Sequence, residues 1–174
     1  READRHEAAV AEQAAQGVMQ GLTDAVRRLC GPIAANRPPQ PVRFVLMNTA
    51  GNRNRDLREP LSLAQRGVVG LVRPLVPPHA DNEQAADYLR TAIGQGHAAV
   101  QWAVVRPDSL RDRDAVSAYE AHPSPIRSAI FDAGHVSRIN VAHFMAELPT
   151  GGAGWGRWRG QMPVLYDTEK RQAA

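Results

Sequence analysis

The stretch Pro41–Asn52, PVRFVLMNTAGN, decides the fold. Its first part, Val42–Met47, is apolar at every position except Arg43. A nearly continuous apolar run of this length is typical of a parallel strand that helices cover on both faces. The small polar residues Asn48–Asn52 follow at once, as in a turn after such a strand. Because ligands bind outside the carboxyl ends of strands in open α/β sheets, the stretch predicts a site as well as a sheet.

A second apolar run, Val100–Leu110, has the same form and includes an Arg-Pro-Asp turn. Two helical patterns, at residues 61–76 and 82–96, separate the two runs. The order strand, helices, strand predicts a crossover unit with a parallel pair of strands. Since parallel strands end at the same edge of a sheet, Asn48–Asn52 and Arg106–Leu110 are expected to lie side by side.

Polar residues mark where helices are expected to begin. Thr23 and Asp24 are plausible caps for one helix near the N-terminus, and Asp81 for the helix that begins at Asn82. Gly94 or Gly96 is expected to end the latter helix. We predict that residues 1–16 form a helical extension and that residues 17–174 form one domain.

The C-terminal part of the sequence has weaker patterns. Asn140–Leu148 predicts a helix with apolar residues on one face. Gln161–Asp167 predicts a short edge strand, because its proline removes a backbone donor. Trp155 and Trp158 lie in an arginine-rich segment, and two tryptophans three apart are expected to anchor a terminal helix on the core.

Composition narrows the possible partners. The chain of 174 residues is 43% hydrophobic and lacks an apolar run long enough to span a bilayer, so we expect a soluble, cytoplasmic protein. Its net charge of +3 comes from arginines interspersed with acids, which argues against nucleic acid as a partner. The single cysteine, Cys30, is expected to be a small buried residue, and the histidines have no metal-binding spacing.

Three segments together resemble a known family. FVLMNTAGN, WAVVRPDSL and SRINVAHFMAEL are similar to the C-terminal half of atypical short-chain dehydrogenase/reductase proteins, the NAD(P)-binding group that includes nucleoside-diphosphate-sugar epimerase-like proteins. The most specific part is an apolar strand that ends in Arg-Pro, with Ser-Arg-x-x-Val-Ala-x-Phe further along the chain. The resemblance implies an α/β protein with a partial Rossmann-like, three-layer fold and a short, mainly parallel sheet.

The resemblance also implies a site for NAD(P). The turn after the first strand would lie near the nicotinamide, and backbone groups after the second strand would face its carboxamide. His79 stands where such proteins usually carry a lysine that contacts the nicotinamide ribose. Thr49 takes the place of a serine that hydrogen-bonds a substrate carbonyl in active relatives. The cofactor-binding residues implied in this way are Asn48, Thr49, Ala50, Gly51, His79, Arg106, Pro107, Asp108 and Ser109.

Two departures from the family pattern qualify this expectation. No GxGxxG or GxxGxxG fingerprint occurs, so the βαβ half that would hold the pyrophosphate is expected to be missing from this sequence. The Tyr-x-x-x-Lys pair of active reductases is also missing at its usual place, because His79 stands where the lysine is expected and Leu75 stands four residues before it. Hydride transfer would then lack its usual proton donor, so catalysis is expected to be impaired.

Three functions remain open on the sequence alone. The chain is expected to bind NAD(P) as a reductase- or epimerase-type protein, or to act as a non-catalytic module that pairs through an exposed sheet edge, giving a dimer or a sheet completed by another chain. It could also be an incomplete gene product. Thr49 could serve only to form the turn, and Arg106 could join loops by ion pairs instead of contacting a ligand.

Overall fold

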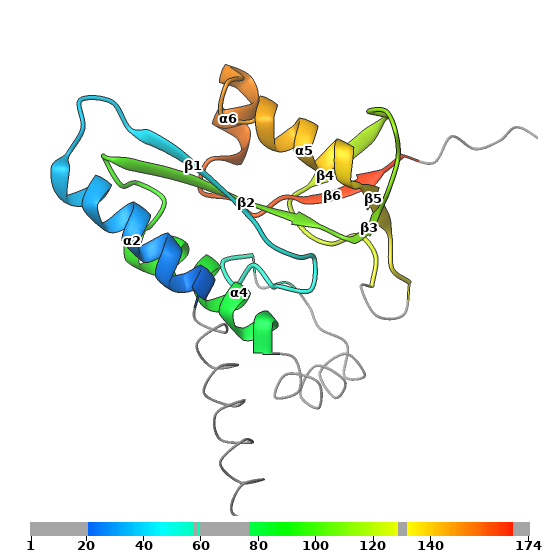
Figure 1. The fold of residues 1–174 in the computed structure, drawn as a ribbon, viewed down its shortest axis with the longest axis horizontal. Helices are drawn as coiled ribbons and strands as arrows, with labels where there is room; N and C mark the ends of the chain where they lie inside the picture. Colours follow the sequence, from blue (N-terminus) through cyan, green and yellow to red (C-terminus); the bar gives the residue numbers. More distant parts are fainter. Residues whose placement is uncertain (1–20, 58, 60–76, 129–131, 169–174) are drawn as a thin grey trace, which may run out of the picture.

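The structure is a computed structural model that describes residues 21–57, 59, 77–128 and 132–168. In Figure 1 a central sheet lies between helices on its two faces. The predicted N-terminal extension, the boundary at residue 17 and the helical pattern at 61–76 lie outside the described residues. Among the described helices, none combines the length and the apolar character needed to cross a membrane.

The main sheet has the strand order β1-β2-β6-β4. Its members are β1 (Val42–Met47), β2 (Val100–Pro107), β6 (Val164–Asp167) and β4 (Tyr119–His122). β1 pairs with β2 in parallel, from Val42 opposite Val100 to Met47 opposite Val105, which confirms the predicted parallel pair. β6 is also parallel to β2, whereas β4 is antiparallel to β6. The short strands β3 (Ser109–Arg111) and β5 (His135–Ser137) form a separate parallel pair.

The prediction that Gln161–Asp167 forms an edge strand is wrong. β6 lies inside the sheet, between β2 and β4. Pro163 does not interrupt the ladder because it stands just before the first residue of the strand, and its carbonyl accepts the backbone N–H of Arg106 at 2.8 Å. The missing donor of a proline therefore costs nothing at this position.

One face of the sheet is covered by α2 (Gly21–Asn36), α4 (Pro77–Tyr88) and the π-helical turn η1 (Leu89–Ile93). The core on this side contains Trp102 and Val104 of β2, together with Cys30 of α2. Cys30 is fully buried, as predicted, and burial raises the pKa of its thiol. Gly94 ends η1 with φ of +75°, a conformation that only glycine adopts easily.

Asp81 does not cap the helix that follows it. α4 begins earlier, at Pro77, and the buried Asp81 carboxylate turns toward the first residues of α2. It accepts the backbone N–H groups of Leu22 at 2.8 Å and Thr23 at 2.9 Å, and the Thr23 hydroxyl donates to it at 2.5 Å. A residue distant in sequence therefore supplies the cap of α2, in place of Thr23 or Asp24.

The other face is covered by α5 (Arg138–Glu147) and α6 (Gly152–Trp158). α5 confirms the predicted helix with a start two residues earlier. Trp155 and Trp158 are both buried against Ala103 and Val105 of β2, as expected for residues that anchor a helix. The guanidinium of Arg43 in β1 lies 5.3 Å from the Trp155 ring centre and links the sheet to α6.

Candidate functional site

The turn after β1 meets the end of β2 at the carboxyl edge of the parallel strands. The backbone N–H of Asn48 donates to the carbonyl of Val105 at 2.7 Å, and that of Ala50 donates to the carbonyl of Pro107 at 2.9 Å. The polar turn after β1 therefore continues the pairing beyond the strand and lies directly beside the end of β2. This contact confirms the predicted juxtaposition of the two segments.

The turn after β1 is fastened to α4 by its asparagines. The side-chain amides of Asn48 and Asn52 both donate to the carbonyl of Asn82, at 2.8 and 3.3 Å. The Asn48 side-chain oxygen accepts the N–H of Thr49, and the Thr49 hydroxyl accepts the N–H of Gly51 at 3.3 Å. Asn48 and Asn52 are buried, so the groups that this turn presents to solvent belong to the half-buried Thr49 and to Gly51.

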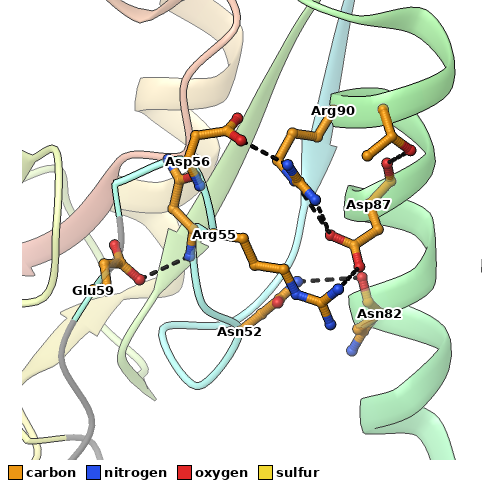
Figure 2. Close-up of polar contacts among 9 residues, drawn as sticks. Asn52, Arg55, Asp56, Glu59, Asn82, Asp87 and Arg90 are labelled. Carbon is orange, nitrogen blue, oxygen red and sulfur yellow. Dashed lines mark hydrogen bonds and ion pairs between the residues drawn. The ribbon is translucent and has the colours of Figure 1, made fainter.

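Ion pairs hold the loop that continues from this turn. Figure 2 shows Arg55 and Asp56 of the loop reaching across to α4 and η1. Arg55 pairs with Asp87 at 2.8 Å, and Asp56 pairs with Arg90 at 2.6 Å. Burial alone lowers the pKa of Arg90, but the hydrogen bond and charge of Asp56, with those of Asp87, raise it above its ordinary value. The loop is thus fixed against the helices at several points.

Arg106 is buried completely and joins three parts of the chain. Its Nε–H donates to the carbonyl of Met162 at 2.6 Å, and the Glu59 carboxylate accepts two bonds at 2.7 and 2.9 Å. The remaining donors reach the carbonyls of Asn52 at 2.7 Å and Pro123 at 3.1 Å. All five N–H groups of this side chain are therefore bonded within the protein, and the backbone N–H of Arg106 is bonded to the carbonyl of Pro163.

Asp108 and Ser109 follow the end of β2. The Asp108 carboxylate accepts the N–H of Ser109 at 2.8 Å and the N–H of Gly134 at 3.0 Å, which joins this turn to the segment before β5. Burial raises the pKa of Asp108, although these two N–H groups act in the opposite direction. Asp108 and Pro107 are buried, whereas Ser109 is exposed.

The residues assigned to the cofactor thus fall into two sets. The first set is buried and forms the inner side of the sheet edge; it consists of Asn48, Ala50, Pro107, Asp108 and the side chain of Arg106. Thr49, Gly51 and Ser109 are its accessible groups. His79 lies in the first turn of α4, and its side chain is outside the described part of the structure.

The Ser-Arg-x-x-Val-Ala segment forms the start of α5. Ser137 is the N-cap, and its hydroxyl accepts the N–H of Asn140 at 3.2 Å. The Asp167 carboxylate at the end of β6 accepts the N–H of Ser137 at 3.1 Å and the Asn140 amide at 2.6 Å. Asn140 also donates to the Ser117 hydroxyl at 2.9 Å. This motif therefore fixes α5 to the sheet. Its spacing is evidence for the fold and not for a catalysed reaction.

Several buried groups at this edge were not singled out from the sequence. Glu59 stands among the interspersed arginines and acids of the sequence, yet its side chain is only 5% exposed. Tyr166 belongs to the segment predicted as an edge strand, although it is buried and packs with Ala50 of the first turn. Within the described residues no group of three His, Cys, Asp or Glu side chains is placed to hold a metal ion.

Comparison of the sequence with protein families gives no match. Comparison with curated proteins gives none either.

Solved structures do resemble the chain. A protein from Bacillus halodurans named as an NAD-dependent epimerase/dehydratase matches 86% of the chain with a TM-score of 0.54 and 16% sequence identity. A Lactobacillus casei protein matches 88% with a TM-score of 0.56 and 12% identity. A Rossmann-fold NAD(P)-binding family protein from Shigella flexneri matches 93% with a TM-score of 0.48 and 19% identity.

The chain spans 54% of the Bacillus halodurans protein and 65% of the Lactobacillus casei protein. At these identities the likeness concerns the path of the backbone and not the chemistry of the site. Taken with the mostly parallel sheet and its helices on both faces, it shows that the described part of the chain has a partial Rossmann-like fold.

Proposed function

We propose that this chain forms the nicotinamide side of an NAD(P) site, in a protein of the atypical short-chain reductase or epimerase type. The observation that carries the proposal is the contact of the turn after β1 with the end of β2, in which Asn48 and Ala50 are bonded to Val105 and Pro107. The accessible Thr49, Gly51 and Ser109 stand at the edge where ligands bind in open α/β sheets. The Bacillus halodurans protein is named as an NAD-dependent epimerase/dehydratase, which supports the same choice of cofactor.

Binding is the better supported part of this function. The Tyr-x-x-x-Lys pair is missing where the resemblance places it, at Leu75 and His79, and no glycine-rich fingerprint occurs, so neither the usual proton donor nor the usual pyrophosphate cradle is available from those positions. Thr49 is the group best placed to hydrogen-bond a substrate carbonyl, since its hydroxyl accepts only a long bond from Gly51. We infer a cofactor site with impaired catalysis, in which Thr49 orients the substrate.

A calorimetric titration with three ligands tests the proposal. If the chain holds only the nicotinamide side, NADP⁺ and nicotinamide mononucleotide should bind with comparable affinity, and AMP should give no heat. Thr49→Trp should weaken binding of NADP⁺ by roughly tenfold or more, a loss of at least about 1.4 kcal/mol, because the indole would occupy the space over the turn.

Leu57→Trp is the matched control, because Leu57 is exposed and follows the turn in the same loop. Its affinity for NADP⁺ should equal that of the unaltered chain. Absence of heat for every nucleotide at concentrations near millimolar would contradict independent binding. Binding of AMP as tight as that of nicotinamide mononucleotide would contradict the proposed orientation.

A second function is favoured by the free side of β1. Among the described strands, β1 has a neighbour on one side only, which is β2. Val42 and Met47 at its two ends are 38% and 48% exposed. An edge strand with apolar ends is a template for pairing with another strand. We propose that β1 pairs with a second copy or with a strand of another chain that completes the sheet.

Light scattering at increasing protein concentration tests this pairing. The unaltered chain should self-associate, and Met47→Lys should remain monomeric, because a charged side chain on an edge strand opposes strand addition. Leu29→Lys is the control, since it alters an apolar residue on α2 that is 55% exposed. A monomer at high concentration for the unaltered chain would exclude self-pairing, and loss of association in the Leu29 variant would assign it to another surface.

A further inference from the structure

The two edges of the main sheet are built differently. The edge strand β4 has four residues, of which Glu120 and His122 carry polar side chains. Short length and charge are the usual protection of an edge against the addition of a strand. β1 has six residues, and Arg43 is its only polar side chain. The edge at β1 therefore lacks the protection that the edge at β4 has.

The one charge of β1 is engaged within the chain. Arg43 donates to the carbonyl of Pro149 at 2.6 Å, and its guanidinium lies over the Trp155 ring of α6. These contacts hold the side chain on the α6 face of the sheet. A charge that is held in this way does not oppose an incoming strand as a free lysine or arginine would.

The ladder with β2 shows which backbone groups β1 directs to its free side. The N–H of Val42 donates to β2 at 2.9 Å, and that of Asn48 donates to it at 2.7 Å, so the even-numbered residues face β2. The odd-numbered residues direct their N–H and C=O groups to the other side, where none of the described strands lies. These residues are Arg43, Val45 and Met47.

The side chains of β1 restrict how a second copy could pair with it. Phe44 and Leu46 belong to the core under α2, whereas Val45 packs against the core under α6. A twofold axis perpendicular to the sheet makes two edge strands antiparallel and keeps the matching helices of both copies on the same face. Residues that stand opposite each other must then point to the same face. Even-numbered residues can therefore pair only with even-numbered ones, and odd with odd.

One of the registers that remain uses all of the free backbone groups. It places Val45 opposite Val45 of the second copy, and Arg43 opposite Met47 on either side of this centre. Each of these pairs exchanges two hydrogen bonds in an antiparallel ladder. The free groups of β1 are thus complementary to themselves, which is what a twofold interface requires.

The two neighbouring registers leave groups unpaired. A shift toward the start of β1 places Pro41 opposite Met47, and Pro41 has no N–H to donate. A shift toward the end of β1 places Thr49 opposite Arg43. The N–H and the carbonyl of Thr49 are already bonded within its own turn, so they are not available to a second strand.

We propose that β1 pairs antiparallel with β1 of a second copy, in the register that places Val45 opposite Val45 and Arg43 opposite Met47. The proposal rests on the second function proposed above, the pairing of β1, and assigns its partner and geometry. The same register brings Pro41 of the second copy level with Thr49. The segment before β1 of one copy then lies beside the cofactor edge of the other.

Disulfide cross-linking under mild oxidation tests this register. Met47→Cys chains alone should give no cross-linked dimer, because the two copies of residue 47 lie four residues out of step, about 14 Å apart. An equal mixture of Met47→Cys and Arg43→Cys chains should give the mixed dimer, since opposed residues have Cα atoms about 5.5 Å apart, within reach of a disulfide. Cys30 is fully buried and should not react.

Val116→Cys is the matched control, because Val116 is 46% exposed, as Met47 is 48% exposed, and lies outside β1. Its mixture with Arg43→Cys should give no dimer. Val45→Pro is an independent variant, since it removes an N–H from the free side and none from the ladder with β2. It should raise the dimer dissociation constant at least tenfold in sedimentation, with an unchanged circular dichroism spectrum.

The outcomes separate the register from the pairing. Cross-linking of Met47→Cys alone as efficient as that of the mixture would overturn the register. So would a chain that sediments as a dimer but gives no mixed cross-link, because its association would then use another surface. An unaltered chain that sediments as a monomer at high concentration would overturn the pairing itself. No nucleotide is added, so each of these failures is distinct from failure of the proposed cofactor site.

Discussion

Replacing Arg106 with methionine should lower the free energy of unfolding by about 3–5 kcal/mol, the largest effect expected for a single change in this chain. The substitution leaves the Glu59 carboxylate, 5% exposed, without its cationic partner. It also removes the donors that the carbonyls of Met162 and Asn52 accept. An uncompensated charge and several unpaired carbonyls would then remain buried together. Urea denaturation followed by circular dichroism measures the loss.

The double variant Arg106→Met with Glu59→Met separates the two causes. Because it removes the buried charge as well, it should recover a large part of the lost stability. Arg138→Met is the control, since Arg138 pairs with Asp112 at the surface, where the two side chains are 57% and 89% exposed. That change should cost less than about 1 kcal/mol. An Arg106→Met variant as stable as the control would contradict the role assigned to this arginine.

Asp81→Ala should lower the free energy of unfolding by about 2–4 kcal/mol, because it removes a charged acceptor from the start of α2. Three bonds are lost at once, from the N–H groups of Leu22 and Thr23 and from the Thr23 hydroxyl. Since Asp81 belongs to α4, the variant should also loosen the packing of the two helices. Thermal unfolding and amide exchange of Leu22 and Thr23 measure the two effects.

Asp24→Ala provides the contrast, because Asp24 is one of the two residues, with Thr23, that the sequence pattern predicts as a cap. Its side chain is half exposed and pairs loosely with Arg27 at 3.8 Å. We expect a loss of less than about 1 kcal/mol from this change. A larger loss of stability in Asp24→Ala than in Asp81→Ala would mean that Asp24, and not Asp81, caps α2.

The parallel pair of strands could be predicted from the sequence because each strand is marked by a pattern within one short stretch of residues. Val42–Met47 and Val100–Val105 are apolar runs followed by turn residues, and that pattern is sufficient to indicate parallel strands. The position of β6 could not be predicted in the same way. A proline beside a short apolar run indicates an edge, and only the structure shows that Pro163 precedes the first residue of the strand and takes part through its carbonyl.

The site was predictable in position and less so in detail. The turn after β1 and the end of β2 meet as expected, but the sequence does not show which of their groups face inward. Glu59 and Asp81 look like ordinary surface acids, since charged residues are mostly exposed. Each is buried against a partner from a distant part of the sequence, which is Arg106 for Glu59 and the start of α2 for Asp81. Partners so far apart leave no periodic signal.

The central place of β6 has a consequence for synthesis of the protein. β2 and β4 do not pair with each other, and both depend on a strand that ends at Asp167. A nascent chain on the ribosome would therefore expose the flank of β2 until β6 had emerged, a delay that favours capture by chaperones or misassembly. Folding of this sheet should accordingly be completed only after β6 has emerged from the ribosome.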